Sequence, residues 1–345
     1  MVHVVLDAMG GDNAPGEVIK GALSAMKESD NIKVTFCGRS DEIKKCIDSE
    51  AKNYFDKPDE VLEARAQIVD AEEVITCDEA PVMAIRRKKD SSMVKGMKLV
   101  KDKEADAFVS AGSSGAILVG GQLIVGRIKG VDRPPLAPLI PTKTPAGVSL
   151  IIDCGANVDA RSNHLVQFAK MGSVYMEHVI GVKNPRVAIV NIGTEEEKGN
   201  MLVKETFPLL KNCPDINFIG SIEAREIPNG GADVIVCEAF VGNVILKMYE
   251  GVGKMMLNTV KDSLMASVRG KLGGLLIKPC LKSAMKTFDA TEYGGAPLLG
   301  LNGLVVKVHG NATMKEISTA IKQCETFMEQ RINEKIAEKI TFADE

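Results

Sequence analysis

The segment VHVVLDAMGGDNAPGEVIKGALSAMK, residues 2–27, decides the fold class of the chain. Its first five residues form a short run that is largely β-branched and apolar, which is typical of a β-strand. A turn rich in Gly, Asp and Asn follows. Pro15 then suits the first position of a helix over residues 17–27, because that position leaves its backbone N–H unpaired in any case. The segment therefore predicts a strand, a turn and a helix in succession.

The same order recurs along the chain. Short apolar runs, each ended by a turn, occupy residues 2–6, 32–37, 107–109, 148–152, 187–192, 216–219, 234–236 and 304–308. Strands that alternate with helices at this spacing indicate βαβ units, and runs that are apolar at nearly every position indicate strands covered on both faces. We predict an α/β fold with a doubly wound, mostly parallel, Rossmann-like sheet.

The length of the chain, 345 residues, exceeds the length at which one hydrophobic core keeps growing. The chain therefore forms either one extended α/β domain or two tightly joined halves. Because no long Pro- and Ser-rich linker is present, we take residues 1–345 as a single extended domain. Apolar residues from Ile317 to Ile340, at spacings of three and four, predict one long amphipathic helix near the C-terminus.

Composition excludes several classes of protein. The 43 Lys and Arg against 46 Asp and Glu, a net charge of −3, argue against a general nucleic-acid-binding surface. The Cys residues form no CxxC pair and the His residues lack the spacing of zinc ligands, which favours a reduced intracellular protein. The first residues lack the basic region of a signal peptide, and no run approaches the ~18 apolar residues of a membrane span. We expect a cytoplasmic protein.

The polar turns fall where α/β proteins bind ligands, at the carboxyl edge of the predicted sheet. They comprise residues 7–13, 110–115, 153–159, 191–200, 240–243 and 309–311. Turns between strands and helices need Gly for chain reversal in any case. However, Gly also lets backbone N–H groups approach an anion, and the helix that follows favours negative charge, so we expect a phosphate site.

Familiar nucleotide and hydrolase motifs are missing from these turns. No GxxxxGK[ST] or GxGxxG is present, which argues against a P-loop and an ordinary dinucleotide site. The run Gly112-Ser113-Ser114-Gly115 is one residue short of the GxSxG elbow, and no His partner is evident, which disfavours an acyl-enzyme on serine.

Several of the segments together resemble one family. They are DAMGGD (7–12) with Ala14-Pro15, RRKK (86–89) with SSM (91–93), SAG (110–112), GRIKG (126–130), DCGAN (153–157), NIGTE (191–195), FVGN (240–243) and YGGA (293–296). In this order they resemble the motifs of the bacterial phosphate acyltransferase family of phospholipid synthesis (PlsX), and the similarity runs from about residue 3 to about residue 330. This chain has Ser113-Ser114 where the family more usually has Asn-Thr.

The resemblance implies a reaction and its partners. It implies transfer of a long-chain acyl group from acyl-[acyl carrier protein] to inorganic phosphate, which gives acyl phosphate for phosphatidic acid synthesis. It also implies a homodimer, a functional link to a membrane glycerol-3-phosphate acyltransferase, no metal or organic cofactor, and a fold related to phosphate acetyltransferases and isocitrate/isopropylmalate dehydrogenases.

The residues suit direct attack by phosphate without a covalent acyl-enzyme. Phosphate is mostly dianionic near neutral pH and hardly needs a general base, and a thiolate with a pKa of about 8.5 is a tolerable leaving group. What remains for the protein is to align the reactants and to stabilise the developing oxyanion. A Ser–His or Cys–His pair is not required for this reaction.

We predict Lys198 and Asn243 as the catalytic residues. The alternative for Lys198 is a surface ion pair, and that for Asn243 is an N-cap of the following helix. Residues predicted to bind the phosphate or the thioester are Asp7, Gly10, Gly11, Ser113, Ser114, Asp153, Asn157, Gly193, Thr194, Gly242 and His309. Residues predicted to contact the carrier protein or phosphate are Arg86, Arg87, Arg127 and Lys129, with solvated helix ends as the alternative.

Residues 244–289 predict a protruding amphipathic helical hairpin that is broken at Gly270 and Gly273-Gly274. From Lys247 to Asp289 there are eight basic and three acidic residues, a local net charge of +5. Basic flanks around the apolar Leu272, Leu275, Leu276 and Ile277 suit contact with an anionic membrane surface. The alternative is that the hairpin packs in a dimer interface.

Two other functions stay open. One is a phosphate acetyltransferase-like enzyme that acts on coenzyme A thioesters, and the other is a non-catalytic membrane-surface scaffold for acyl carrier protein.

Overall fold

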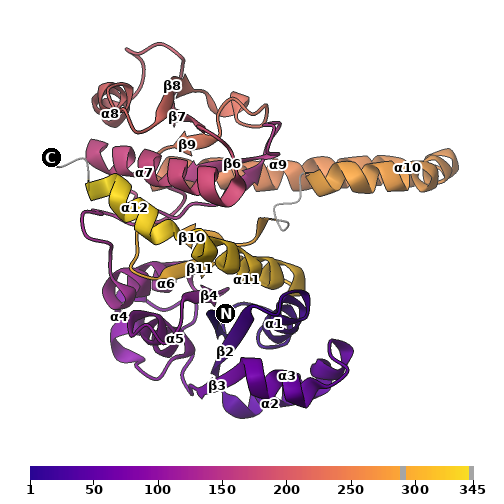
Figure 1. The fold of residues 1–345 in the computed structure, drawn as a ribbon. Coiled ribbons are helices and arrows are strands. Elements are labelled where there is room, and N and C mark those ends of the chain that lie inside the picture. The colour runs from indigo at the N-terminus through magenta and orange to yellow at the C-terminus, as the bar shows by residue number, and fades with distance from the viewer. Residues whose placement is uncertain (288–292, 342–345) are drawn as a thin grey trace.

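The computed structural model describes residues 1–287 and 293–341 (Figure 1). Within them the strands lie in two sheets, whose orders are β10-β11-β4-β1-β2-β3 and β5-β6-β9-β7-β8. The pairs are parallel except that β10 and β5 are antiparallel to their neighbours. The strands are β1 (Val2–Asp7), β2 (Ile32–Gly38), β3 (Ala66–Asp70), β4 (Ala107–Ser110), β5 (Leu139–Pro141), β6 (Val148–Ile152), β7 (Arg186–Val190), β8 (Asn217–Ile222), β9 (Val234–Val236), β10 (Ala296–Leu298) and β11 (Leu304–Lys307).

Helices cover both faces of each sheet. They are α1 (Gly16–Glu28), α2 (Ser40–Glu50), α3 (Pro58–Arg65), α4 (Pro81–Arg87), α5 (Ser92–Lys101), α6 (Ser114–Gly120), α7 (Ser162–Tyr175), α8 (Met201–Lys211), α9 (Ala239–Met265), α10 (Val268–Thr287), α11 (Met314–Glu329) and α12 (Ile332–Thr341). On β1, the buried Val4 and Leu6 pack with α1 and α11, while Val5 between them packs with α5 and α6. This alternation confirms a doubly wound α/β fold.

The division into two sheets was not predicted. The second sheet lies between β4 and β10 in sequence, and the chain then returns to the first sheet, where β11 pairs with β4. One cluster of buried side chains nevertheless includes Leu6 of the first sheet and Ile152 of the second. Whether residues 1–345 act as one extended domain or two joined halves stays a prediction.

The predicted C-terminal helix is two helices. The structure ends α11 at Glu329 and begins α12 at Ile332, with Arg331 between them at φ 50°. That left-handed conformation interrupts the helix although the apolar spacing continues through it, which is why the pattern alone gave one helix.

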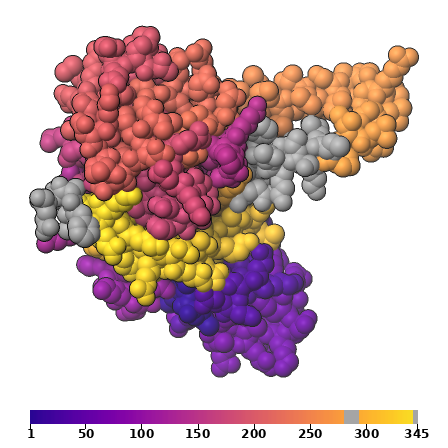
Figure 2. All heavy atoms as spheres, turned by 45° about the horizontal axis from the view of Figure 1, so that its top comes forward, coloured from indigo at the N-terminus to yellow at the C-terminus, as the bar shows by residue number. Residues whose placement is uncertain are grey.

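The predicted hairpin is present as α9 and α10. It projects from the body of the molecule as an arm, seen in orange in Figures 1 and 2. Two details of the prediction are wrong. The break between the helices falls at Ala266 and Ser267, and Gly270 and Gly273-Gly274 lie inside α10. The helix α9 also begins before Asn243, at Ala239.

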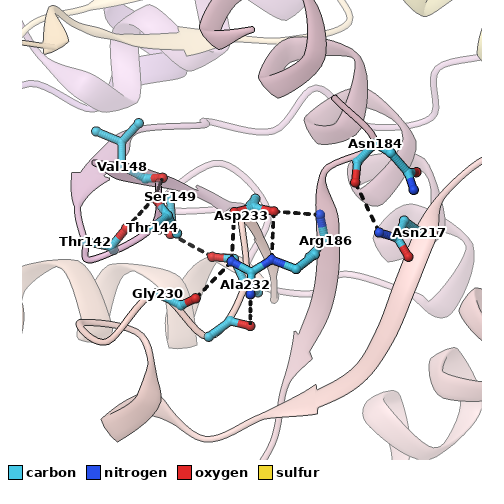
Figure 3. Close-up of polar contacts among 11 residues, drawn as sticks. Thr142, Thr144, Val148, Ser149, Asn184, Arg186, Asn217, Gly230, Ala232 and Asp233 are labelled. Carbon is cyan, nitrogen blue, oxygen red and sulfur yellow. Dashed lines mark hydrogen bonds and ion pairs between the residues drawn. The ribbon is translucent and has the colours of Figure 1, made fainter. Parts of the chain in front are cut away.

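A polar cluster stabilises the amino edge of the second sheet (Figure 3). The Arg186 guanidinium donates to Asp233 from Nε at 3.1 Å and from Nη2 at 3.0 Å, and the backbone N–H of Arg186 donates to the same carboxylate at 2.8 Å. Nearby, the buried Ser149 hydroxyl donates to the Ala232 carbonyl at 2.7 Å. These contacts fix the starts of β7 and β9 at the edge opposite the polar turns, so we assign them a structural role.

Candidate active site

The six polar turns form two groups rather than one. Three follow β1, β4 and β11, which are neighbours in the first sheet, and three follow β6, β7 and β9, which are neighbours in the second. Because these strands are parallel within each group, the turns of a group meet at one carboxyl edge. The polar turns therefore lie at two sheet edges, not at the single edge that the sequence predicted.

Asp7 organises the first group of turns. Its buried carboxylate accepts hydrogen bonds from the hydroxyls of Ser92 at 2.6 Å and Ser110 at 2.7 Å, and the Ser110 oxygen in turn accepts from the Gly112 N–H at 2.9 Å. Burial raises the pKa of Asp7, and these hydrogen bonds oppose the rise. Because its hydrogen-bond donors come from the fold itself, Asp7 holds three segments together. Ser92 and Ser110 lie in motifs that carry the resemblance, but neither was predicted as a site residue.

The two glycines after Asp7 allow a close approach of backbones. A Cβ on Gly10 would lie 2.5 Å from the Asp7 Oδ2 atom, and Gly11 has φ +97° and would place a Cβ 2.8 Å from the Gly310 carbonyl oxygen. The Asp12 N–H donates to that same carbonyl at 2.7 Å. The turns after β1 and β11 are thus joined. His309 is exposed in the latter turn, and its Nδ1 atom accepts from the Asn311 N–H at 3.5 Å.

The serine pair after β4 has two different environments. Ser113 is buried and is the N-cap of α6, where its hydroxyl accepts from the Ala116 N–H at 3.5 Å, whereas Ser114 is exposed. Arg86 and Arg87 are exposed in the last turn of the neighbouring helix α4. The structure thus leaves both arginines accessible from solvent.

Asp153 organises the second group of turns. Its fully buried carboxylate accepts from the N–H groups of Leu136, Gly155 and Ala156, each at 3.0 Å, and from the Asn157 side-chain amide at 2.7 Å. Burial raises the pKa of Asp153, opposed by these hydrogen bonds. Like the Asp7 carboxylate, the Asp153 carboxylate accepts hydrogen bonds from the surrounding chain and orders the loop around it.

The turn after β7 carries Lys198. The Asn191 side-chain amide donates to the Lys198 carbonyl at 3.1 Å, which closes the loop. The Lys198 ammonium donates to Glu195 at 2.8 Å, and the side chain is 50% exposed. A Cβ on Gly193 would lie 2.5 Å from the Lys198 Cδ atom, while Thr194 is exposed. In this structure Lys198 thus makes the surface ion pair considered as the alternative, and its side chain is accessible to a ligand.

The start of α9 corrects the capping alternative for Asn243. The N-cap is Glu238, whose carboxylate accepts from the N–H groups of Phe240 at 2.6 Å and Val241 at 2.9 Å. Asn243 lies one turn into the helix and is exposed, so its amide is not needed to begin the helix. The Ala239 N–H donates to the Asn157 carbonyl at 3.1 Å, which fixes α9 to the turn that Asp153 organises.

Arg127 and Lys129 lie in the segment that follows α6 and are exposed. The Arg127 guanidinium donates to the Asp132 carbonyl, which fixes one side of its planar head. The organising carboxylates Asp7 and Asp153 take their hydrogen bonds from other residues, so Arg127 and Lys129 lie outside the two carboxylate-centred groups of turns.

Sequence reasoning missed Lys307, the last residue of β11. It pairs in register with Ser110, so it lies at the same carboxyl edge as Asp7. Burial, with a smaller contribution from Lys247 of α9, lowers the pKa of Lys307 to about 8. A charged residue inside the otherwise apolar run 304–308 was the available signal.

Two absences complete the description. Over residues 1–287 and 293–341, no three His, Cys, Asp or Glu side chains gather in an arrangement that could hold a metal ion. In that same part of the chain, no helix combines the length and apolar character that crossing a membrane requires.

Solved structures share the fold. A phosphotransacetylase from Streptococcus pyogenes superimposes with a TM-score of 0.62 at 16% identity, covering 95% of this chain and 94% of that one. The EutD phosphotransacetylase from Staphylococcus aureus gives a TM-score of 0.57 at 17% identity, covering 94% of both chains. The molecule is therefore an α/β protein of the phosphotransacetylase fold, as the resemblance implied.

The family follows from sequence relatives. A family model described as fatty acid synthesis protein matches residues 2–335. The phosphate acyltransferase of Clostridium novyi (strain NT) is 50% identical over 339 residues, 98% of each chain, and that of Alkaliphilus oremlandii (strain OhILAs) is 49% identical over 340 residues, 99% of this chain and 98% of that one. The chain belongs to the phosphate acyltransferase family and is an acyltransferase.

Proposed function

We propose that this acyltransferase moves a long-chain fatty acyl group from acyl-[acyl carrier protein] to inorganic phosphate and so supplies acyl phosphate for phosphatidic acid synthesis. The observation that carries the proposal is the pair of carboxylate-organised turn groups at the two sheet edges. The carboxylates of Asp7 and Asp153 accept hydrogen bonds from the turns themselves. The backbone N–H groups of the Gly-rich turns and the exposed amide and ammonium side chains are therefore proposed to bind the anion.

The most deeply buried thiols near the polar turns argue against an acyl-enzyme on those cysteines. Burial raises the pKa of Cys37 to about 12 and raises the pKa of Cys154 and Cys237 well above the ordinary value. A buried thiol of raised pKa is a poor nucleophile because little of it is thiolate. A phosphate oxygen would instead form the C–O bond to the thioester carbonyl, the C–S bond would break, and the thiolate would take a proton from solvent.

Lys198 and Asn243 are proposed to act on this reaction. The Lys198 ammonium would leave Glu195 for a phosphate or the oxyanion, and the Asn243 amide would donate to the thioester oxygen. The exposed Arg86 and Arg87, with Arg127 and Lys129, are proposed to meet phosphate or an acidic carrier protein, which would make binding salt-sensitive.

The hairpin is proposed to hold the enzyme at a membrane reversibly. Leu272, Leu275 and Leu276 lie at helical spacings of three and four on α10 and are 61%, 69% and 81% exposed. Ile277 and the basic Arg269, Lys271 and Lys278 lie in the same stretch. Acyl phosphate is labile, and its acceptor enzyme, a glycerol-3-phosphate acyltransferase, is proposed to be in the membrane, so release at the surface would shorten its path.

A homodimer is also part of the proposal. The exposed face of α9 carries Phe240, Val244, Met248 and Met255, each at least half exposed, and an apolar face of this length favours a partner. Burial of this face in a dimer and membrane contact through α10 are compatible, because they use different helices of the hairpin.

A phosphate acetyltransferase-like reaction on coenzyme A thioesters is the second candidate, favoured by the fold shared with phosphotransacetylases. A carrier-protein scaffold is the third. The test is to incubate the protein with labelled phosphate and either palmitoyl-carrier protein or acetyl-coenzyme A. The proposal expects a hydroxylamine-sensitive acyl phosphate from the former, product from acetyl-coenzyme A alone would favour the second candidate, and no product from either would favour a scaffold.

A further inference from the structure

Lys307 is a cation at the carboxyl edge of the first sheet that the proposed reaction has not used. Its register partner is Ser110, whose hydroxyl donates to Asp7, and the next residue, Val308, donates its N–H to the Ser110 carbonyl at 2.9 Å. The side chain therefore starts beside the turns after β1 and β4. Its position is fixed by a strand, which holds a charged group more rigidly than a loop does.

Few groups of the fold stabilise the positive charge of the Lys307 ammonium. It donates to the Val308 carbonyl, and among the described residues no carboxylate forms an ion pair with it. Burial lowers its pKa to about 8, yet part of the side chain keeps contact with solvent. A cation held in this way favours an anion that can reach it from solvent.

The groups that act electrostatically on Lys307 come from several elements. They are Asp12 from the turn after β1, Cys77 from the segment after β3, and Lys247 from α9. Lys247 is four residues from Asn243, so the two share a face of α9. The Lys247 ammonium itself donates to Glu250 at 2.8 Å, so its effect on Lys307 is a through-space contribution to the positive potential rather than a contact.

We propose that the Lys307 ammonium binds the inorganic phosphate that attacks the thioester, with Lys247 adding to the positive potential at the same place. This assignment rests on the proposed function and deepens it, because it places the phosphate between the turn after β1 and the start of α9. The competing structural role, in which Lys307 only donates to Val308, requires no anion and predicts no effect on phosphate affinity.

The assignment gives phosphate binding a pH dependence. Lys307 binds the anion as an ammonium, so kcat/KM for phosphate falls as pH rises through about 8 in the free enzyme. Lys307→Arg keeps the charge at every accessible pH and moves that fall to higher pH, because a guanidinium does not deprotonate in proteins.

The experiment compares wild type, Lys307→Met and Lys307→Arg, with Lys33→Met as the matched control. Lys33 lies near the amino end of β2 in the same sheet, so its loss removes a lysine from the opposite edge. Lys307→Met is expected to raise KM for phosphate roughly 10–100-fold, the usual effect of losing one hydrogen bond to a charged group, with little change in KM for the acyl donor. Lys33→Met is expected to match wild type.

Binding of inorganic phosphate alone, followed by ³¹P NMR line broadening, separates this inference from the proposed reaction. Wild type that binds phosphate but releases no thiol would refute the reaction and leave the binding comparison intact. Broadening by wild type and Lys307→Arg but not by Lys307→Met supports the assignment. Equal broadening by Lys307→Met, an unchanged KM for phosphate, or no binding by wild type overturns it. If Lys307→Met does not fold, an unshifted pH profile of Lys307→Arg overturns it.

Discussion

Gly242 lies so close to Asp153 that a Cβ on Gly242 would stand 1.9 Å from the Asp153 carbonyl oxygen. The contact joins the first turn of α9 to the loop that Asp153 organises, and the Cys237 thiol donates to the same carbonyl at 3.6 Å. Since the obstructing atom is backbone, it cannot rotate away as a side chain would. The position of α9, and with it that of Asn243, depends on the absence of a side chain at residue 242.

Gly242→Ala is therefore expected to displace the start of α9. We expect a loss of roughly 1–3 kcal/mol in the free energy of unfolding, typical of overpacking. We also expect kcat of the folded variant to fall, because Asn243 moves with the start of α9. Gly251→Ala on the same helix is the control, because a Cβ there meets nothing within 4 Å, and it should be neutral or slightly stabilising. Denaturant titration and steady-state kinetics measure both. Wild-type kcat and stability in Gly242→Ala would show that the contact does not position the helix.

Lys198→Ala and Asn243→Ala are expected to lower kcat strongly in a folded protein. Removal of one preorganised oxyanion donor typically costs roughly 10²–10³ in kcat. Asn243→Ala should fold normally, because Glu238 caps α9. Lys211→Ala is the matched control, since its ion pair with Glu196, at 2.6 Å, is exposed to a similar degree as that of Lys198 with Glu195. Retention of more than about half of wild-type kcat by both site variants would refute the assignment.

Lys307→Met is expected to stabilise the fold in phosphate-free buffer at pH 7. Burial depresses the pKa of Lys307 from 10.5 to about 8, so protonation favours the unfolded chain and the charged lysine costs up to about 3 kcal/mol below pH 8. That cost declines as pH rises from about 8 to about 10.5. The stability difference between variant and wild type, measured in denaturant at pH 7 and pH 9.5, should therefore shrink at the higher pH. Lower stability of the variant at pH 7 would contradict the burial of a charge.

Leu275→Glu/Leu276→Glu is expected to abolish sedimentation with anionic vesicles while the dimer and activity in solution persist. Two carboxylates on the exposed face of α10 remove apolar area and add repulsion. The control is Leu209→Glu/Ile219→Glu, which adds the same charge on the body of the molecule. It replaces one leucine and one isoleucine side chain, each 47% exposed. Equal sedimentation of the α10 variant and wild type would refute membrane contact there. Loss of the dimer instead would assign this face to subunit packing.

The sequence predicted where the polar turns lie along the chain better than it predicted how the strands before them are arranged in sheets. Periodicity places the strands around residues 2–6 and 148–152, because strands buried on both faces are continuously apolar. It cannot tell which strands pair, since pairing of β11 with β4 depends on contacts distant in sequence. The edge strands β5 and β10 are three residues long and contain Pro, so they leave almost no pattern.

Within the candidate site, the sequence indicated which residues lie in the polar turns better than it indicated the role of each residue. Asp7 and Asp153 were predicted to bind the phosphate or the thioester, and in the structure both order turns through buried hydrogen bonds. Asn243 was predicted to be catalytic, with an N-cap as the alternative because Asn favours that position; the structure excludes the alternative, since the Glu238 carboxylate accepts from the first free N–H groups of α9. Lys307 was overlooked although a charge inside the apolar run 304–308 was a signal, because its place beside Ser110 depends on the pairing of β11 with β4, which no local pattern encodes.

The most direct test of the proposed reaction measures thiol release from palmitoyl-carrier protein with and without inorganic phosphate, in the presence of a chelator. We predict that release requires phosphate, proceeds fully with the chelator, and yields one acyl phosphate for each thiol released. Release at the same rate without phosphate would identify a thioesterase and contradict the account, and loss of activity on chelation would contradict the metal-free mechanism.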